Sequence, residues 1–268
     1  MEVDPRKCVA CSNCVPVCPM EAIYIDPAVN RATVNQEECV ECHACYRGMS
    51  KEHMNPTLVR GVRRVLKWFR VRFDPEPDVC PTSALTSQDL SWPRVIRRAF
   101  SDPLMVHEST GIAGRGTEEV KTNDVTGRVQ EGEAGFTIEF GRPGVGVRFR
   151  DVQKMTTALA RLPVEFEENN PVSALMADRA TGLLKEDVLN EKVLSAILEL
   201  KTRLPHVPAV LGEIERVAQE VDTIVSIGVS TRCDAQGDNH LEPVLEREGY
   251  TFFRGKTNLG LGRRPVTA

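Results

Sequence analysis

The sequence lacks any run that approaches the roughly 20 consecutive apolar residues of a membrane-spanning helix. Its first residues contain no apolar core like that of a secretory signal peptide. The net charge is only −4 over 268 residues, which is too weak to indicate a nucleic acid or a membrane as the partner. With 41% hydrophobic and 27% charged residues, the composition is that of a globular chain of one large domain or two ordinary ones.

Cysteine is the residue that stands out, because eight of the nine cysteines fall into one pattern. The first run reads Cys8-x2-Cys11-x2-Cys14-x3-Cys18-Pro19. The second run reads Cys39-x2-Cys42-x2-Cys45, and its fourth member is displaced to Cys80-Pro81. The two Cys-Pro segments also repeat, since Cys18-Pro-Met-Glu-Ala-Ile matches Cys80-Pro-Thr-Ser-Ala-Leu. Each pairs a turn-forming proline with a small and an apolar residue.

This pattern resembles the ligand set of a bacterial-type ferredoxin that carries two [4Fe–4S] clusters, over about residues 1–90. In that family three thiolates of one tight loop reach three irons of a cubane, and the fourth comes from the other run. The resemblance therefore implies two ligand sets, which are Cys8, Cys11, Cys14 and Cys80 for one cluster and Cys39, Cys42, Cys45 and Cys18 for the other.

The sequence departs from the family at one place, because residues 46–79 stand where three residues usually separate the third and fourth cysteines. If Cys80 is not a ligand, a [3Fe–4S] centre at the first site is the alternative. Structural zinc also uses Cys-x2-Cys pairs, but usually as two spaced pairs for each ion. A disulfide framework needs an oxidising compartment. Reduced thiolates and oxygen-labile clusters instead predict a cytoplasmic protein of an anaerobe.

The insertion is basic. Its centre, residues 59–73, has no acidic residue, and Val59, Val62, Leu66 and Phe69 follow the spacing of one helical face. We expect a helix that Asn55-Pro56 starts and Asp74-Pro75 stops. Its arginines either are solvated or paired with the acidic front of the domain, or they form a docking surface for an acidic partner or an anionic ligand. A membrane-surface helix is less favoured, because Gly61 interrupts the pattern and the apolar stripe is narrow.

Residues 91–133 are expected to form an extended linker after a short helix near Ser91–Phe100, since glycine, threonine and charged residues dominate and periodicity is weak. The stretch holds polar side chains suited to specific contacts, namely Arg115, Lys121, Asn123, Asp124 and Arg128. We hypothesise that it contacts a partner subunit. Tyr24 and His43 lie near the cysteine runs and either pack there or bond to cluster sulfide.

Residues 134–268 change to an α/β pattern. Residues 135–140 alternate, with Phe136, Ile138 and Phe140 on one face. Further strands are expected at 164–166, near 172–176, at 193–200 and at 223–229, with helices from Asp151 and over 207–221. A last helix at 241–248 and a strand at 250–253 would follow. The order β-α-β-β-α-β is that of a ferredoxin-like α/β plait, and at pattern level it resembles ACT domains. The whole chain is therefore predicted to be α+β.

The second half shows no nucleophile–base arrangement. Cys233 stands alone, and neither His206 nor His240 has the spacing of a metal ligand. The loop Gly141-Arg-Pro-Gly-Val-Gly146 either cradles a phosphate or only permits a tight turn, and its lack of a Lys-Ser/Thr ending excludes a P-loop.

Three functions remain open. The first is an electron-transfer subunit that relays single electrons through two clusters to or from a flavo- or metalloenzyme partner. The second is a redox-linked metabolite sensor that uses the ACT-like domain. The third is a complete reductase. It is the least supported hypothesis, because we recognise no flavin or nicotinamide site in the sequence. We favour the first, and the sequence leaves homo-oligomer formation open.

Overall fold

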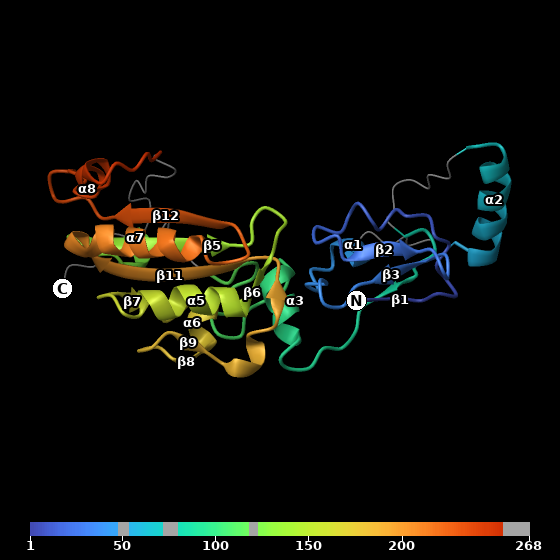
Figure 1. Cartoon of the computed structure of the whole chain (residues 1–268), viewed down its shortest axis with the longest axis horizontal. Coiled ribbons are helices and arrows are strands. Elements are labelled where there is room, and N and C mark those ends of the chain that lie inside the picture. The colour runs from blue at the N-terminus through green and yellow to red at the C-terminus, as the bar shows by residue number, and fades with distance from the viewer. Residues whose placement is uncertain (48–53, 72–79, 118–122, 254–268) are drawn as a thin grey trace. The chain divides into compact units, whose positions relative to one another are not determined.

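The computed structural model describes residues 1–47, 54–71, 80–117 and 123–253. The chain divides into two compact units, Met1–Asp102 and Pro103–Ala268, each of which is described by itself (Figure 1). Both helices and sheets are present, which confirms the α+β class. In the described part of the chain, no helix has both the length and the apolar character needed to cross a membrane.

The first unit is built from short strands and loops. Strands β2 (Ile23–Asp26) and β3 (Arg31–Val34) form the expected hairpin, and β1 (Glu2–Val3) pairs with β4 (Leu85–Thr86). Helix α1 (Ala44–Arg47) follows the second cysteine run, and α3 (Val95–Ser101) closes the unit. Helix α3 confirms the short helix that was expected near Ser91–Phe100.

The insertion contains helix α2 (Pro56–Trp68). The Asn55 side chain accepts hydrogen bonds from the amides of Thr57 and Leu58, which confirms the predicted start. The helix ends earlier than residue 73. Arg70 takes a left-handed conformation with φ of 56°, and the Val71 amide donates to the Leu66 carbonyl at 2.9 Å, as in a Schellman motif. The expected stop at Asp74 lies outside the described residues.

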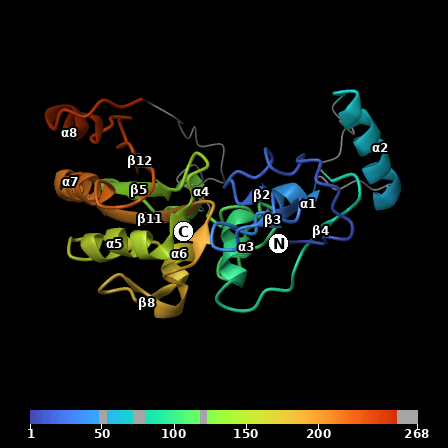
Figure 2. The same cartoon turned by 45° about the vertical axis from the view of Figure 1, so that its right-hand side comes forward.

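A four-stranded sheet forms the core of the second unit, in the order β12, β5, β11 and β7, with every neighbouring pair antiparallel. Its strands are β5 (Glu133–Phe140), β7 (Glu165–Phe166), β11 (Ala196–Arg203) and β12 (Val225–Thr231). Helix α5 (Phe149–Leu159) connects β5 to β7, and α7 (Val207–Ala218) connects β11 to β12. The two helices run side by side (Figures 1 and 2).

The strand alternation places the core as expected. Phe136, Ile138 and Phe140 are all fully buried, while Thr137 and Glu139 lie on the opposite face of β5. The smaller elements of the unit are α4 (Asn123–Thr126), β6 (Val147–Arg148), α6 (Pro171–Ala174), β8 (Met176–Asp178), β9 (Leu183–Leu184), β10 (Lys192–Val193), α8 (Glu242–Arg247) and 3-10 turns at Glu186–Val188 and Leu204–His206.

Several predicted elements of this unit were wrong. Residues 172–176 are not a strand, because Asn170 caps a short helix, α6, that Pro171 starts. The strand expected at 193–200 is shifted to β11, and the strand expected at 250–253 is absent from these described residues. Strand β12 was expected to be buried, but it is an edge strand whose residues 226–228 are exposed.

The segment before β5 packs on its own unit. The Arg115 guanidinium lies 2.7 Å from the Glu139 carboxylate, and Arg128 lies 3.2 Å from Glu167. The Asn123 side chain bonds to the backbone of Val129 in both directions. These three side chains, which were hypothesised to contact a partner subunit, make contacts inside the unit, and the contact with a partner stays a prediction. Lys121 and the side chain of Asp124 lie outside what is described.

Two cysteine-lined cavities as candidate metal centres

The first cavity brings together the three cysteines of the first run and the displaced Cys80. Its lining contains Cys8, Cys11, Cys14 and Cys80 together with apolar residues such as Val3, Val9, Ile25 and Leu85. Cys8, Cys14 and Cys80 are buried, and Cys11 is partly exposed. The inserted residues 46–79 therefore do not prevent Cys80 from reaching the first run.

The second cavity brings together the second run and Cys18. Its lining contains Cys18, Cys39, Cys42 and Cys45 together with Met20, Ile23, Val34 and Val40. The two sets are crossed, because the last cysteine of each run lies with the first three of the other.

The backbone repeats itself around the two cavities. Non-glycine residues take positive φ at the second and fourth positions after the leading cysteine of each run, namely Ala10, Ser12, Glu41 and His43. The third position after each Cys-Pro cysteine does the same, at Glu21 with φ of 51° and Ser83 with φ of 51°. Such conformations cost roughly 1–2 kcal/mol for each non-glycine residue. Their recurrence at equivalent positions marks a backbone bent to face its cysteines inward.

Backbone amides donate to the cysteine sulfurs in the same repeated way. The Ala22 amide donates to Cys18 Sγ at 3.3 Å, and the Ala84 amide donates to Cys80 Sγ at 3.1 Å. In both segments the donor is the fourth residue after the cysteine. The Ala32 amide also donates to Cys8 Sγ at 3.3 Å. Donors of this kind favour a thiolate and tune the potential of a metal centre that it binds.

The thiols of each cavity interact with one another. Burial raises the pKa of Cys14 to about 12, and the nearby Cys11, Cys80 and Cys8 add to this rise. Burial likewise raises the pKa of Cys45 to about 12, with contributions from Cys42, Cys18 and Cys39. Four thiolates in so dry a site need a cationic centre to hold them together. The donor set therefore fits a metal centre.

The geometry also bears on which kind of metal centre fits. Across the described ranges, no three His, Cys, Asp or Glu side chains converge as the ligands of a single ion do. Four cysteines line each cavity. A structural zinc ion draws its four ligands to a single point, so this arrangement suits a polynuclear iron–sulfur cluster better.

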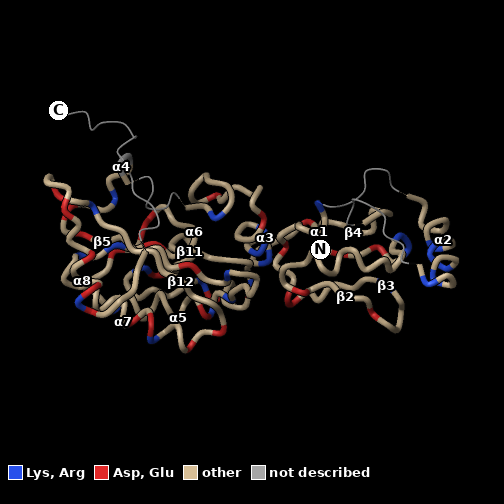
Figure 3. The backbone as a smooth tube through the Cα atoms, turned by 90° about the horizontal axis from the view of Figure 1, so that it is seen from above, with Lys and Arg blue, Asp and Glu red and all other residues tan. Residues whose placement is uncertain are grey.

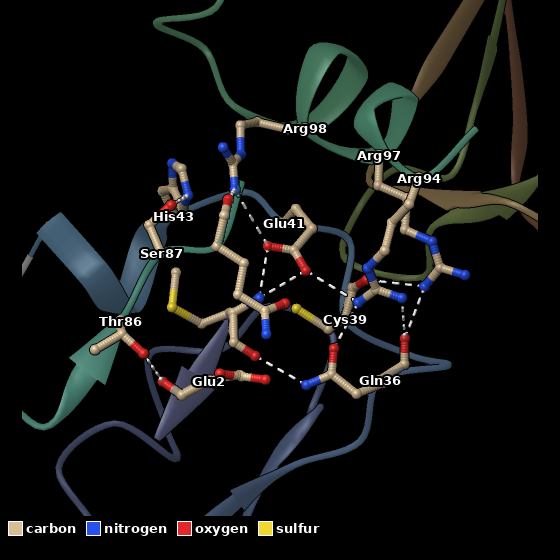
Figure 4. Close-up of polar contacts among 12 residues, drawn as sticks. Glu2, Gln36, Cys39, Glu41, His43, Thr86, Ser87, Arg94, Arg97 and Arg98 are labelled. Carbon is tan, nitrogen blue, oxygen red and sulfur yellow. Dashed lines mark hydrogen bonds and ion pairs between the residues drawn. The ribbon is translucent and has the colours of Figure 1, made fainter. Parts of the chain in front are cut away.

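Arginines of α3 and of its N-cap position support the second cavity. Arg97 Nη1 donates to the carbonyls of Gln36 at 2.9 Å, Glu37 at 3.1 Å and Cys39 at 3.0 Å. Arg94 donates to Gln36 and, at 3.0 Å, to the Glu41 carboxylate (Figure 4). The sequence analysis missed these side chains. Their signal was the Arg-x2-Arg-Arg spacing on α3, but sequence could not show which loop they reach.

Glu41 lies between Cys39 and Cys42 and is buried. Both of its carboxylate oxygens lie 2.7 Å from the amino group of Met1. Burial alone would raise the pKa of Glu41, and hydrogen bonds from that amino group and from Arg94 more than offset this, so the pKa lies below its usual range. The buried charge is therefore compensated.

His43 lies at the second cavity, and its ring is bonded to protein on both sides. Its Nδ1 lies 2.8 Å from Asp102 Oδ2, and its Nε2 lies 3.0 Å from Ser87 Oγ. Burial lowers the pKa of His43 from its ordinary value. Arg47 donates to Asp102 at 2.6 Å and to the Cys42 carbonyl at 2.7 Å. Tyr24, the other aromatic residue singled out from sequence, is exposed on β2 and lines neither cavity.

The loop at Gly141 is a tight turn. The amides of Val145 and Gly146 both donate to the Gly141 carbonyl, at 3.1 and 2.9 Å, so neither points to a ligand. Gly141 has φ of +88°, and a Cβ there would lie 2.7 Å from the Leu194 carbonyl oxygen. These observations support the turn and not the phosphate cradle. Cys233 is exposed and lines neither cysteine cavity.

Residues 1–48 match the family model of the 4Fe-4S dicluster domain. The N-terminal segment is of the ferredoxin type. Ferredoxin-1 of Rhodobacter capsulatus is 40% identical over 42 residues, which make up 16% of this chain and 62% of that protein. A second Ferredoxin-1 of Rhodobacter capsulatus matches to the same extent. The chain thus spans less than two thirds of the curated relatives that it matches, and no solved structure matches it.

The match ends at residue 48, so both α2 and Cys80 lie beyond the matched residues. The match supports [4Fe–4S] binding by the N-terminal segment, and with it a part in iron–sulfur electron transfer. What completes the first site and what the second unit does rest on the structure alone.

Proposed function

We propose that the chain is an electron-transfer subunit that relays single electrons through two [4Fe–4S] clusters. Cys8, Cys11, Cys14 and Cys80 would hold the first cluster, and Cys39, Cys42, Cys45 and Cys18 the second. A bound [4Fe–4S] cluster supplies one-electron chemistry at a potential set by hydrogen bonds to its sulfurs and by its exposure. The observation that supports this most is the crossed arrangement of two four-cysteine cavities.

The protein's own residues would do three things at these sites. The inward-facing cysteines would bind the clusters. The amides of Ala22 and Ala84 donate hydrogen bonds to two of the cysteine sulfurs. The apolar lining keeps water away from the buried sulfurs. Arg97 holds three carbonyls of the loop that carries Cys39, and so keeps that loop in one conformation.

Cys80 as a ligand is supported by its local structure. It matches Cys18 in the amide that donates to its sulfur and in the positive φ three residues later. A chain that only happened to place a cysteine here would not need either feature. We therefore favour a complete [4Fe–4S] centre over a [3Fe–4S] centre at the first site.

The second unit is proposed to bind the redox partner enzyme. The sheet order β12, β5, β11 and β7 and the sequence of elements β5, α5, β7, β11, α7 and β12 support a ferredoxin-like α/β plait similar to ACT domains. A cytoplasmic oxidoreductase complex is the setting we propose, and the partner would be a flavo- or metalloenzyme that exchanges electrons with the clusters.

The ninth cysteine provides a matched control for a test of this proposal. Cys80→Ser and Cys233→Ser would each be purified anaerobically, and iron, sulfide and the electron paramagnetic resonance spectrum compared with those of the wild type. We expect Cys233→Ser to keep about eight irons per chain, the content of two [4Fe–4S] clusters. Cys80→Ser should lose iron at one site only. An unchanged iron content and spectrum in Cys80→Ser would remove Cys80 from the ligand set.

A further inference from the structure

Helix α2 turns its apolar face away from the protein. Leu58, Val62, Val65 and Phe69 recur at the spacing of one helical face, and Trp68 lies beside them. Leu58 is 68% exposed, Phe69 is 65% exposed and Trp68 is 81% exposed. Exposed apolar patches of this kind mark an interaction site.

The opposite face of α2 meets the ferredoxin-type segment. Val59 is buried, and the Arg60 guanidinium donates to the carbonyls of Arg6 and, at 3.1 Å, Cys8. Arg63 donates to the Val9 carbonyl. An amphipathic helix of a globular protein normally buries its apolar stripe. Here arginines face the protein instead, which leaves the apolar stripe for another surface.

Cations accompany the exposed stripe. Arg64, Lys67 and Arg70 are all exposed, and the stretch from Pro56 to Val71 contains no acidic residue (Figure 3). A helix with Trp, Phe and Leu on one side and Lys and Arg around it is typical of helices that lie in a membrane interface. Trp in particular prefers the level of the lipid headgroups.

The structure removes both reasons that the sequence gave against a membrane surface. Gly61 does not interrupt the helix, which is continuous from Pro56 to Trp68. The stripe is also broader than the spacing suggested, because Leu58, Val65 and Trp68 widen it. The narrow stripe expected from sequence was counted from Val59, which is buried on the other side.

We propose that α2 binds an anionic lipid surface. Its apolar stripe enters the boundary between headgroups and acyl chains, and Arg64, Lys67 and Arg70 pair with lipid phosphates. A protein groove would also accept the stripe, but the exposed cations around it and the terminal Trp favour a layer of negative headgroups. This lipid binding by α2 does not depend on the proposal that the chain holds two clusters.

The test uses the full chain with its clusters and sucrose-loaded vesicles, either of phosphatidylcholine alone or with a third of phosphatidylglycerol. We expect the protein to sediment with the anionic vesicles and to be released by high salt. Leu58→Gln with Val65→Gln should abolish binding. Because each cation near a charged membrane contributes about 1 kcal/mol, Arg64→Gln, Lys67→Gln and Arg70→Gln together should weaken partitioning about a hundredfold.

Three exposed arginines of the second unit, Arg161, Arg203 and Arg247, give a control of equal charge. Their joint replacement by Gln should leave binding unchanged, and an equal loss would show nonspecific charge attraction and overturn the proposal. The cluster absorbance of every variant shows that its first unit is intact. The proposal is also overturned if the wild type stays in the supernatant with both kinds of vesicle.

Discussion

Cys18 and Cys80 occupy equivalent positions although they lie in different parts of the chain. An amide four residues on donates to each sulfur, at 3.3 Å for Cys18 and 3.1 Å for Cys80, and the residue three positions on has φ of 51° in both cases. The insertion therefore separates Cys80 from its run in sequence without changing its local structure. The consequences of this repeated backbone can be measured.

The left-handed conformation at Ser12 can be tested apart from packing, since its side chain is exposed and its φ is 70°. Ser12→Val should destabilise the first site by about 1–2 kcal/mol, because a branched residue is strained at this φ. Ser12→Gly is the matched control and should be neutral or stabilising. The readout is the rate of iron loss to a chelator. Equal rates for the two variants would show that the conformation at Ser12 does not matter.

Arg97 is only 3% exposed and donates to three carbonyls. Arg97→Met should cost roughly 3 kcal/mol, because buried carbonyls lose a charged donor. Iron should leave the second site first, as followed by the loss of its paramagnetic signal. The stability of Arg97→Lys should fall between those of the wild type and Arg97→Met, since an ammonium cannot spread over three carbonyls as a guanidinium does. Loss from the first site instead would contradict the placement of this side chain.

Replacing Gly141 or Gly212 by Ala should change the stability of the second unit in opposite directions. Gly141→Ala should destabilise the second unit by at least about 2 kcal/mol, because of its positive φ and the backbone oxygen 2.7 Å from the added Cβ. Gly212→Ala should stabilise it by about 0.5–1 kcal/mol, since that position is helical and nothing lies within 4 Å. Denaturant unfolding of both variants checks this. If Gly141→Ala left the free energy of unfolding unchanged, the tight turn at Gly141 would be contradicted.

The stability of the second unit should depend on pH through His107. It is 3% exposed, and burial holds its pKa below the ordinary value of 6.5. The unfolded chain therefore takes up a proton at a higher pH than the folded chain does. Stability should be full above about pH 6.5 and should fall as the pH drops from there toward the folded-state pKa.

The melting temperature between pH 7.5 and 5 measures this effect. His107→Gln should flatten the slope, whatever its effect on stability at neutral pH. His240→Gln is the control, because it removes an exposed imidazole and leaves the buried His107 in place. A slope that survives in His107→Gln would mean that other groups set the pH dependence.

The sequence predicted the cysteine pairing better than the surroundings of the cysteines. The ferredoxin resemblance, which the spacing and the Cys-Pro repeats carry, implied that Cys80 belongs with the first run, and the four cysteines line one cavity in the structure. Arg94 and Arg97 were missed because they reach loops more than 50 residues away, a contact that no local pattern encodes. Helix α2 was predicted, but the periodicity of a stripe does not say whether it faces the protein or the solvent.

In the second unit, the errors have equally specific causes. The Asn-Pro signal that starts α2 was used at Asn55 but overlooked at Asn170, where the same cap starts α6. Strand β12 has the valine and isoleucine content of a buried strand, yet it lies at the sheet edge. Composition reports how apolar a strand is, whereas its exposure depends on which strands become its neighbours.

The central claim is that the chain holds two clusters, and the most direct measurement is the iron and sulfide content of the anaerobically purified protein, with spin quantification after reduction. Two [4Fe–4S] clusters predict about eight irons and eight sulfides per chain, with two spins after full reduction. About four irons and a single isolated spin would contradict the claim and leave one of the two cysteine cavities without a cluster.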